Sequence, residues 1–203
     1  MVEALEKLVE SLSRMPTIGK KSAWRLALYC MERPREEVDS LAENLKKIKT
    51  SITICKECFN YSESEVCPIC SSHSRDTSIL CVVEKPMDVF TFENGGRYRG
   101  LYHVLGGVLS PINGITADKL HIKELLTRVE TRKPREIILG LGAGSDAETT
   151  SLYLGRLLSK YPVRITRLAR GLPAGLELEY VDQLTLTQAL NERTNITYGD
   201  ESE

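Results

Sequence analysis

Apolar residues recur with the period of an α-helix through the first fifty positions. The spacing i, i+3, i+4, i+7 predicts an amphipathic helix over residues 1–13, with its apolar stripe formed by Leu5, Leu8, Val9 and Leu12. Residues 16–19 interrupt this pattern. Further helices are predicted from about 20 to 31 and from about 36 to 50, and Pro34 separates the two. The N-terminal region is therefore expected to be helical.

Beyond residue 76 the pattern changes to short aliphatic runs that alternate with helix-length stretches. Buried strands are predicted at 79–83, 102–105, 136–139 and 163–168, and helices are predicted over 120–129 and around 152–158. Strands that are separated by helices favour a parallel sheet with both faces covered. The expected fold class is therefore α/β, and a helical region precedes the sheet domain along the chain.

Between these two regions stand two pairs of cysteines, Cys55 with Cys58 and Cys67 with Cys70. Two intervening residues let both sulfurs of a pair turn toward one ion, and two such pairs complete a tetrahedral thiolate site typical of structural Zn²⁺. The alternative is a pair of disulfides, which a reducing cytoplasm disfavours. We expect one zinc ion that stabilises a small module and leaves no coordination position open for catalysis.

Composition is that of an ordinary globular protein. The 203 residues are 41% hydrophobic and 27% charged, and the net charge is −1. Any binding to nucleic acid must therefore depend on a local cluster of positive charge. The first residues contain no apolar run that could serve as a signal peptide, and no stretch approaches the length of a membrane span, so a cytoplasmic location is expected.

A local cluster of this kind occurs at the first helical break. Arg14, Lys20, Lys21 and Arg25 lie within twelve residues that contain no acid. Lys21 and Arg25 are four residues apart and share a helix face, while the turn before them presents a helix N-terminus to an anion. The segment resembles a helix-hairpin-helix that grips DNA phosphates. The alternative is an ordinary helical hairpin with solvated lysines, and the residues alone leave both open.

Acidic residues follow two of the predicted strands. Glu84 comes directly after 79–83, and Asp146 and Glu148 follow 136–139 after a glycine-rich loop. The carboxyl ends of parallel strands are where ligands gather, and these three acids could hold Mg²⁺. The arrangement resembles a Toprim domain. A capping box, with Ser145 as the N-cap and Glu148 at N3, explains the same acids without a metal.

A glycine-rich stretch, 95–107, follows the first of these acids along the chain. Arg97 and Arg99 alternate there as on an exposed strand, and no Walker lysine pattern accompanies them. We expect His103 to be a packed, hydrogen-bonded residue without a catalytic role. Cys81, and likewise Cys30, is expected to be a small buried apolar residue.

Taken together, these segments resemble the bacterial recombination proteins of the RecR family. The resemblance covers about residues 3 to 195 and rests on the cysteine quartet and on the stretches 16–27, 82–89, 98–107, 109–114 and 168–175. It divides the chain into a helix-hairpin-helix region (1–50), a zinc-finger module (51–76), a Toprim-like α/β domain (77–168) and a C-terminal segment with oligomer contacts and a loose acidic tail (169–203).

The resemblance implies a mediator of recombinational DNA repair and not an enzyme. Members of the family act with RecO or RecF to load RecA on single-stranded DNA, and they are expected to form ring-like tetramers that encircle DNA. It also implies site residues: Lys21 and Arg25 contact DNA with Lys20 as an additional charge, and Glu84, Asp146 and Glu148 engage RecO.

Two segments depart from the family pattern. Thr17 replaces a glycine of the hairpin, and Gly142 and Ala143 replace an asparagine and a proline before Asp146. Two other functions are alternatives to the mediator: a Mg²⁺-dependent Toprim nuclease and a zinc-containing adaptor without DNA contact.

Overall fold

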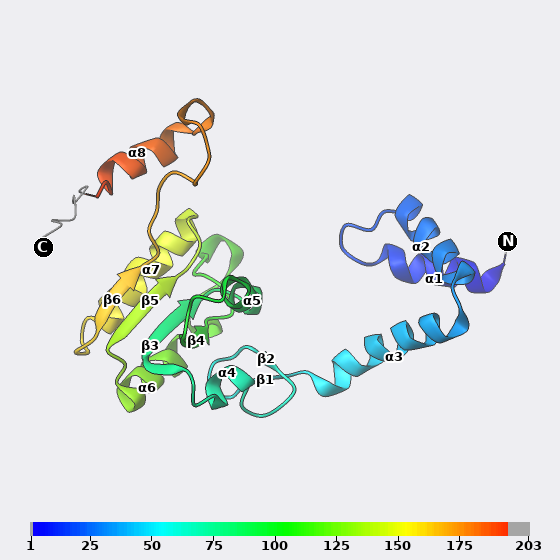
Figure 1. The fold of residues 1–203 in the computed structure, drawn as a ribbon, viewed down its shortest axis with the longest axis horizontal. Helices are drawn as coiled ribbons and strands as arrows, with labels where there is room; N and C mark the ends of the chain where they lie inside the picture. Colours follow the sequence, from blue (N-terminus) through cyan, green and yellow to red (C-terminus); the bar gives the residue numbers. More distant parts are fainter. Residues whose placement is uncertain (1, 195–203) are drawn as a thin grey trace, which may run out of the picture. The chain divides into compact units, whose positions relative to one another are not determined.

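The chain forms two compact units, Met1–Ile52 and Thr53–Glu203 (Figure 1). The structure, a computed structural model, describes residues 2–194. The end of the chain, for which the sequence predicts a loose acidic tail, lies outside these residues. The finer division into four parts stays a prediction.

The first unit is helical, as the apolar periodicity predicted. It contains α1 (Glu3–Ser13), α2 (Lys20–Glu32) and α3 (Arg35–Ser51). Helices α1 and α2 pack against each other through Val9, Ala23 and Ala27, with Trp24 partly buried beside them. The small alanine side chains let the two helices approach closely, so a hairpin with a short apolar core results.

Helix α3 has a different character. Leu41, Leu45 and Ile48 follow one another at helical spacing, yet each is about half exposed, and none of the described residues of α3 is buried. The apolar positions that predicted this helix therefore form an exposed stripe.

The second unit begins with the cysteine-rich module. Strands β1 (Thr53–Ile54) and β2 (Tyr61–Ser62) pair in an antiparallel hairpin, and the short helix α4 (Pro68–Ser71) follows. Proline at the first position of α4 fits there because that position needs no amide donor. The hairpin and α4 bring the two cysteine pairs together.

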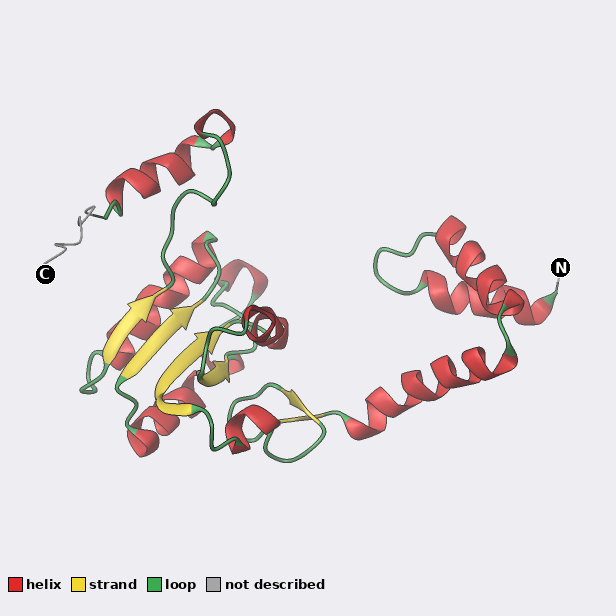
Figure 2. Ribbon diagram, viewed as in Figure 1, coloured by secondary structure: helices red, strands yellow, loops and turns green. Residues whose placement is uncertain are grey.

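A four-stranded parallel sheet forms the centre of the second unit (Figure 2). Its spatial order is β4-β3-β5-β6, made of β3 (Asp76–Val83), β4 (Gly100–Val104), β5 (Glu136–Gly140) and β6 (Arg164–Arg167). The crossover helices are α5 (Pro86–Gly95), α6 (Ile122–Arg132) and α7 (Ser145–Leu158), and the 3₁₀ turns Pro111–Asn113 and Ala117–Lys119 precede α6. The α/β fold class and its four strands are confirmed.

The sheet separates two hydrophobic cores. On one face Leu80, Val82 and Ile137 pack with residues of α6 and α7, such as Leu125 and Leu154. On the other face Cys81, Val83 and Tyr102 pack with Val89 of α5. Cys81 is fully buried, and burial raises the pKa of its thiol to about 12, in keeping with an apolar role. Cys30, by contrast, is only half-buried.

Strand β4 differs from its prediction at its first residues. It begins at Gly100, two residues before the predicted start, and Arg97 and Arg99 lie in the loop before it, so the expectation of an exposed strand there is wrong. A Cβ atom at Gly100 would collide with the Tyr98 hydroxyl and stand 2.7 Å from the Ile79 carbonyl oxygen. Glycine is required there by this close approach, and its low strand propensity hid the start of β4.

The chain then passes a 3₁₀ turn, Leu178–Tyr180, and ends its described part with α8 (Gln183–Asn191). Asp182 caps α8 by accepting a hydrogen bond from the Thr185 amide. Among the described residues, none of the helices combines the length and apolar character that crossing a membrane requires.

Candidate metal centre and nucleic-acid interface

The four paired cysteines converge on one point. Within residues 2–194 they are the one group of three or more His, Cys, Asp or Glu side chains whose ligand atoms all lie within 4.8 Å of one another. The Cys58 and Cys67 sulfurs are 3.6 Å apart. A tetrahedral zinc site with bonds of about 2.3 Å has sulfur–sulfur edges of about 3.8 Å. The cage therefore has the size that zinc needs.

All six cysteines are free thiols, so the disulfide alternative is wrong. The backbone is already arranged around the sulfurs: the Cys67 amide donates to Cys55 Sγ at 3.3 Å and the Cys70 amide to Cys67 Sγ at 3.4 Å. Such amide donors stabilise thiolates, which are the form that binds metal.

The sulfurs also influence one another's protonation. The hydrogen bond between Cys58 and Cys67 is the largest cause that lowers the pKa of Cys67, and a hydrogen bond with Cys70 lowers it further. The hydrogen bond between Cys58 and Cys67 also raises the pKa of Cys58. Four thiolates at this separation repel one another and need a cation between them. All four protein ligands are supplied, so Zn²⁺ held there would stabilise the module and leave no open position for catalysis.

The turn of the first cysteine pair is fixed by an aromatic contact. Phe59 adopts the left-handed conformation (φ 64°) directly after Cys58. Its ring stacks on His121 at 3.9 Å between centroids and meets His103 edge-on at 5.4 Å. Phe59 thereby docks the cysteine module on the residues that precede α6.

His103 has the packed role that the sequence analysis expected. It is fully buried, and its Nε2 donates to the His121 carbonyl at 2.8 Å. Burial lowers the pKa of His103 to about 3, so the ring is neutral at physiological pH. Its Nδ1 has no hydrogen-bond partner among the described residues, as expected for an unprotonated nitrogen in an apolar site.

The candidate DNA-binding residues lie at the start of α2. Lys20 and Lys21 are its first two residues, Arg25 follows one turn later, and all three are exposed. Gly19 is the N-cap, and within the described part of the chain no side chain caps this helix and no acid occupies its first turn. The first amides of α2 and two lysines therefore face solvent together, which is an arrangement that suits an anion.

The loop before α2 contains the departure at Thr17. This residue has φ 68°, in the left-handed region that a glycine occupies without strain. Thr17 thus keeps the path that a glycine would give the turn, at a conformational cost.

The three predicted acids follow the carboxyl ends of β3 and β5, which are neighbours in the sheet. From β3 the chain crosses to β4 on one side, and from β4 it returns to β5 on the other, so the acids lie at the switch point of the topology. The sheet therefore brings Glu84 to the same edge as Asp146 and Glu148.

Basic side chains already engage two of these acids. Glu84 pairs with Lys85 at 2.9 Å. Glu148 pairs with Arg167 at 3.2 Å and with Arg170 at 2.5 Å, and Arg167 also contacts Glu192 after α8. A magnesium ion at Glu148 would have to displace two guanidinium groups. Magnesium binding at the acids stays a prediction.

The capping-box interpretation of the acids is wrong. The N-cap of α7 is Gly144, which makes Ser145 the first helical residue and places Glu148 beyond N3. Within the described structure, no side-chain hydrogen bond caps this helix, and the Glu148 carboxylate points to arginines. Gly144 is in the extended conformation and has no side chain, so it supplies no side-chain acceptor to the first amides of α7.

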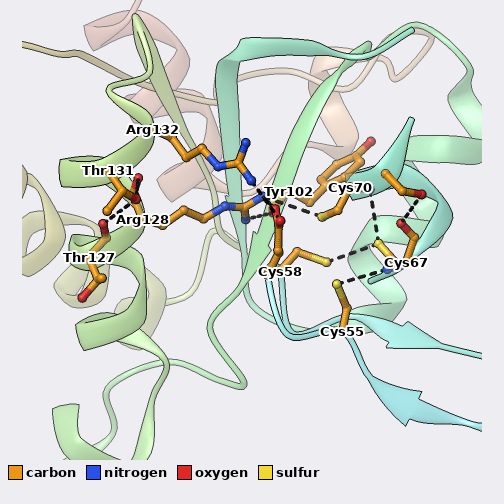
Figure 3. A network of polar contacts seen from close by, with 11 residues as sticks. Cys55, Cys58, Cys67, Cys70, Tyr102, Thr127, Arg128, Thr131 and Arg132 are labelled. Carbon is orange, nitrogen blue, oxygen red and sulfur yellow. Dashed lines mark hydrogen bonds and ion pairs between the residues drawn. The ribbon is translucent and has the colours of Figure 1, made fainter. Parts of the chain in front are cut away.

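Arg128 of α6 contacts the Cys70 sulfur and is a site residue that the sequence analysis did not identify, while Arg132, one turn later, contacts Glu57 and no cysteine sulfur among the described residues. Both reach from α6 toward the cysteine module, as Figure 3 shows, and both contact Glu57, which lies between Cys55 and Cys58. A shallow groove of about 440 Å³ separates the module from α6 and is lined by both arginines and by Lys123. No local pattern marks these arginines, because arginine on a helix is ordinarily exposed.

The chain matches models of known protein families along almost its whole length. Four family models match consecutive parts of the chain: RecR helix-hairpin-helix (5–49), RecR four-cysteine zinc finger domain (52–72), Toprim domain (78–169) and RecR C-terminal (171–194). The zinc finger match contains the whole cysteine quartet, which together with the sulfur geometry establishes a structural zinc site.

Several curated relatives match over nearly the whole chain, and each is named recombination protein RecR. The protein of Dehalococcoides mccartyi strain 195 is 45% identical over 192 residues, covering 95% of this chain and 94% of the relative. That of Deinococcus radiodurans is 47% identical over 194 residues, covering 96% and 87%. That of Rubrobacter xylanophilus is 44% identical over 193 residues, covering 95% and 97%. With this identity and this coverage, and with three RecR family models matching its parts, the chain belongs to the RecR family of recombination proteins.

Proposed function

We propose that this protein is a non-enzymatic, DNA-binding mediator of recombinational repair in the cytoplasm. In this role it promotes the loading of RecA on single-stranded DNA together with RecO or RecF. The observation that carries the proposal is the start of α2, where exposed Lys20, Lys21 and Arg25 surround uncapped amides.

This arrangement suits phosphates and not bases. Amide donors at a helix N-terminus and two or three cations can hold one or two phosphate oxygens of any sequence. Net charge of the whole chain is −1, so binding depends on this local cluster and falls steeply with salt. DNA of any sequence, in single-stranded, double-stranded or gapped form, is therefore the proposed ligand.

The acids at the sheet switch point are the proposed docking site for RecO. Glu84, Asp146 and Glu148 lie at an edge where α/β proteins commonly bind ligands. A partner with basic residues would exchange with Lys85, Arg167 and Arg170 for these carboxylates. RecF is the second proposed partner.

Self-association into a tetrameric ring is the proposed way in which the protein encircles DNA. The exposed apolar stripe of α3, with Leu41, Leu45 and Ile48, offers surface for such contacts in the first unit. A closed ring would hold DNA by topology in addition to the weak phosphate contacts of each hairpin.

A Mg²⁺-dependent nuclease is the alternative, because the Toprim domain match and the three acids favour it. The arginines on Glu148 argue against this alternative, since their positive charges occupy the carboxylate that a cation would need.

A gel-shift assay with labelled gapped DNA, with and without Mg²⁺, separates these functions when half of each sample is deproteinised. A shift of the labelled DNA on the gel, with strands that are intact after deproteinisation, supports the function as a mediator. Strands that are cut only with Mg²⁺ would contradict it and favour the nuclease. Absence of both a shift and cleavage, with RecO present as well as absent, would contradict DNA binding and favour the zinc-containing adaptor.

A further inference from the structure

Arg128 is a buried arginine on α6, with only 9% of its side chain exposed. Arginine is costly to bury unless its donors are paired. Here Nη1 donates to the Tyr102 carbonyl at 2.6 Å, and Nη2 donates to the Cys70 sulfur at 3.7 Å. The Glu57 carboxylate lies 3.9 Å from Nη2. The guanidinium therefore lies between the zinc cage and strand β4 (Figure 3).

Cys70 is the zinc ligand that most needs support. Cys55, Cys58 and Cys67 are almost completely buried, whereas Cys70 is only partly buried. An exposed thiolate is the one that a proton or a chelator reaches first. The contact with Arg128 is made on this sulfur.

Charge favours the same contact. A Zn²⁺ ion with four thiolates carries a net negative charge, and a guanidinium stays protonated at every physiological pH. A cationic donor beside one sulfur reduces the repulsion among the thiolates and orients the lone pairs of that sulfur.

We propose that Arg128 is a positioning residue of the zinc centre, which holds the Cys70 sulfur in place while its other donor is anchored on the Tyr102 carbonyl of β4. The planar fork of arginine can make both contacts at once. A lysine at this position keeps the charge but can satisfy only one of them well. This role does not depend on DNA binding.

The first test measures zinc release from the full-length, zinc-loaded protein into excess 4-(2-pyridylazo)resorcinol at fixed pH. Arg128→Met is expected to accelerate release on the order of tenfold, the effect typical of losing an outer-shell partner. Arg128→Lys is expected to give an intermediate rate, because it keeps the charge and loses the fork.

Arg132→Met is the matched control. Arg132 lies one turn later on α6 and contacts Glu57 at 2.9 Å, and among the described contacts it reaches no cysteine sulfur. Its release rate is expected to equal that of the wild type. Wild-type release from folded Arg128→Met, or equal acceleration in the Arg132→Met control, would overturn the proposal.

A second measurement separates positioning from general stability and does not need Arg128→Met to fold. Cobalt-substituted protein has a sulfur-to-cobalt charge-transfer band whose energy depends on hydrogen bonds to the thiolates. Lysine cannot keep the Tyr102 anchor and at the same time direct a hydrogen bond at the Cys70 sulfur. A weaker hydrogen bond raises the energy of the sulfur lone pairs, so the band of Arg128→Lys is expected to move to longer wavelength, while that of Arg132→Met stays in place. Coincident bands in all three proteins would overturn the proposal.

Discussion

The backbone conformation of Thr17 lowers the stability of the loop between α1 and α2. Its φ of 68° lies in a region where a residue with a Cβ atom is strained by about 1–2 kcal/mol. Glycine avoids this strain but makes the unfolded chain more flexible, which costs about 0.4–1 kcal/mol.

Thr17→Gly is therefore expected to raise the free energy of unfolding of the first unit by about 0.5–1 kcal/mol. Trp24, the single tryptophan, belongs to the core of this unit, so its fluorescence during urea unfolding measures the change. Ser22→Gly is the control, since Ser22 lies within α2, where glycine lowers stability. Equal or lower stability of Thr17→Gly would contradict the strain at this position.

His103 makes the stability of the second unit depend on pH. Its pKa of about 3 in the fold is far below the value of about 6.5 expected when unfolded. Between these values only the unfolded state binds the proton, so stability falls by about 1.4 kcal/mol for each unit that the pH decreases from about 6.5 toward 3.

His103→Gln removes this proton uptake and keeps a donor for the His121 carbonyl. Urea unfolding by circular dichroism between about pH 4.5 and 7 is expected to show a shallower loss of stability in this variant. Zinc content, measured for both proteins at each pH, separates this effect from acid-driven loss of zinc. Parallel pH profiles of variant and wild type would contradict the role of His103.

Single residues differ in how far sequence alone could place them. The zinc ligands were predictable because two short spacings define the site locally. Arg128 was not, since its partner Cys70 lies 58 positions away and only the docking of α6 brings them together. The sequence predicted Glu148 as a site residue, and this stays a prediction, but it did not predict the arginine partners of Glu148, which come from β6 and the segment after it.

Elements with one-sided apolar patterns were predicted well, and those without such a pattern were missed. Helix α5 is an example: Met87 and Phe90 are exposed while Val89 is buried, so its apolar residues surround the helix and predict no face. The sequence features that indicate α5 are confined to its N-terminus. Pro86 stands at the first position, and Asp88 accepts a hydrogen bond from the Lys85 amide at 2.7 Å.

The hairpin of α1 and α2 carries the prediction on DNA binding. Lys21→Ala with Arg25→Ala is expected to weaken binding to DNA of any sequence and to reduce the slope of log affinity against log salt by about two units. Fluorescence anisotropy at several salt concentrations measures this slope. Lys47→Ala, an exposed lysine on α3 of the same unit, is the control. An unchanged slope in the double variant would place the DNA site elsewhere.

At the scale of the whole molecule, the two units separate the proposed tasks. The first unit carries the hairpin, and the second carries the zinc module and the acidic switch point. Substitutions in one unit are therefore expected to leave the task of the other intact, because each unit has its own hydrophobic core.

Glu84→Ala tests this separation. It is expected to leave DNA binding unchanged and to weaken RecO association by about tenfold, or about 1.4 kcal/mol. Isothermal titration calorimetry with RecO gives the affinity. Glu130→Ala, an exposed acid on α6 of the same unit, is the control. Undiminished RecO binding would exclude the acids as the docking site.

The contacts on strand β4 have a consequence for solubility. This strand is the outer member of the sheet, and nearby elements occupy several of its outward polar groups: Tyr102 O accepts from Arg128, Val104 N donates to the Cys58 carbonyl at 2.8 Å, and Val104 O lies 3.1 Å from His121 Nδ1. An uncovered edge invites intermolecular strand pairing. The metal-folded module supplies one of these three contacts, and α6 with its N-cap residue His121 supplies the other two. Oxidants that strip zinc from the cysteines would therefore uncover the part of this edge that Cys58 covers and make intermolecular strand pairing easier there.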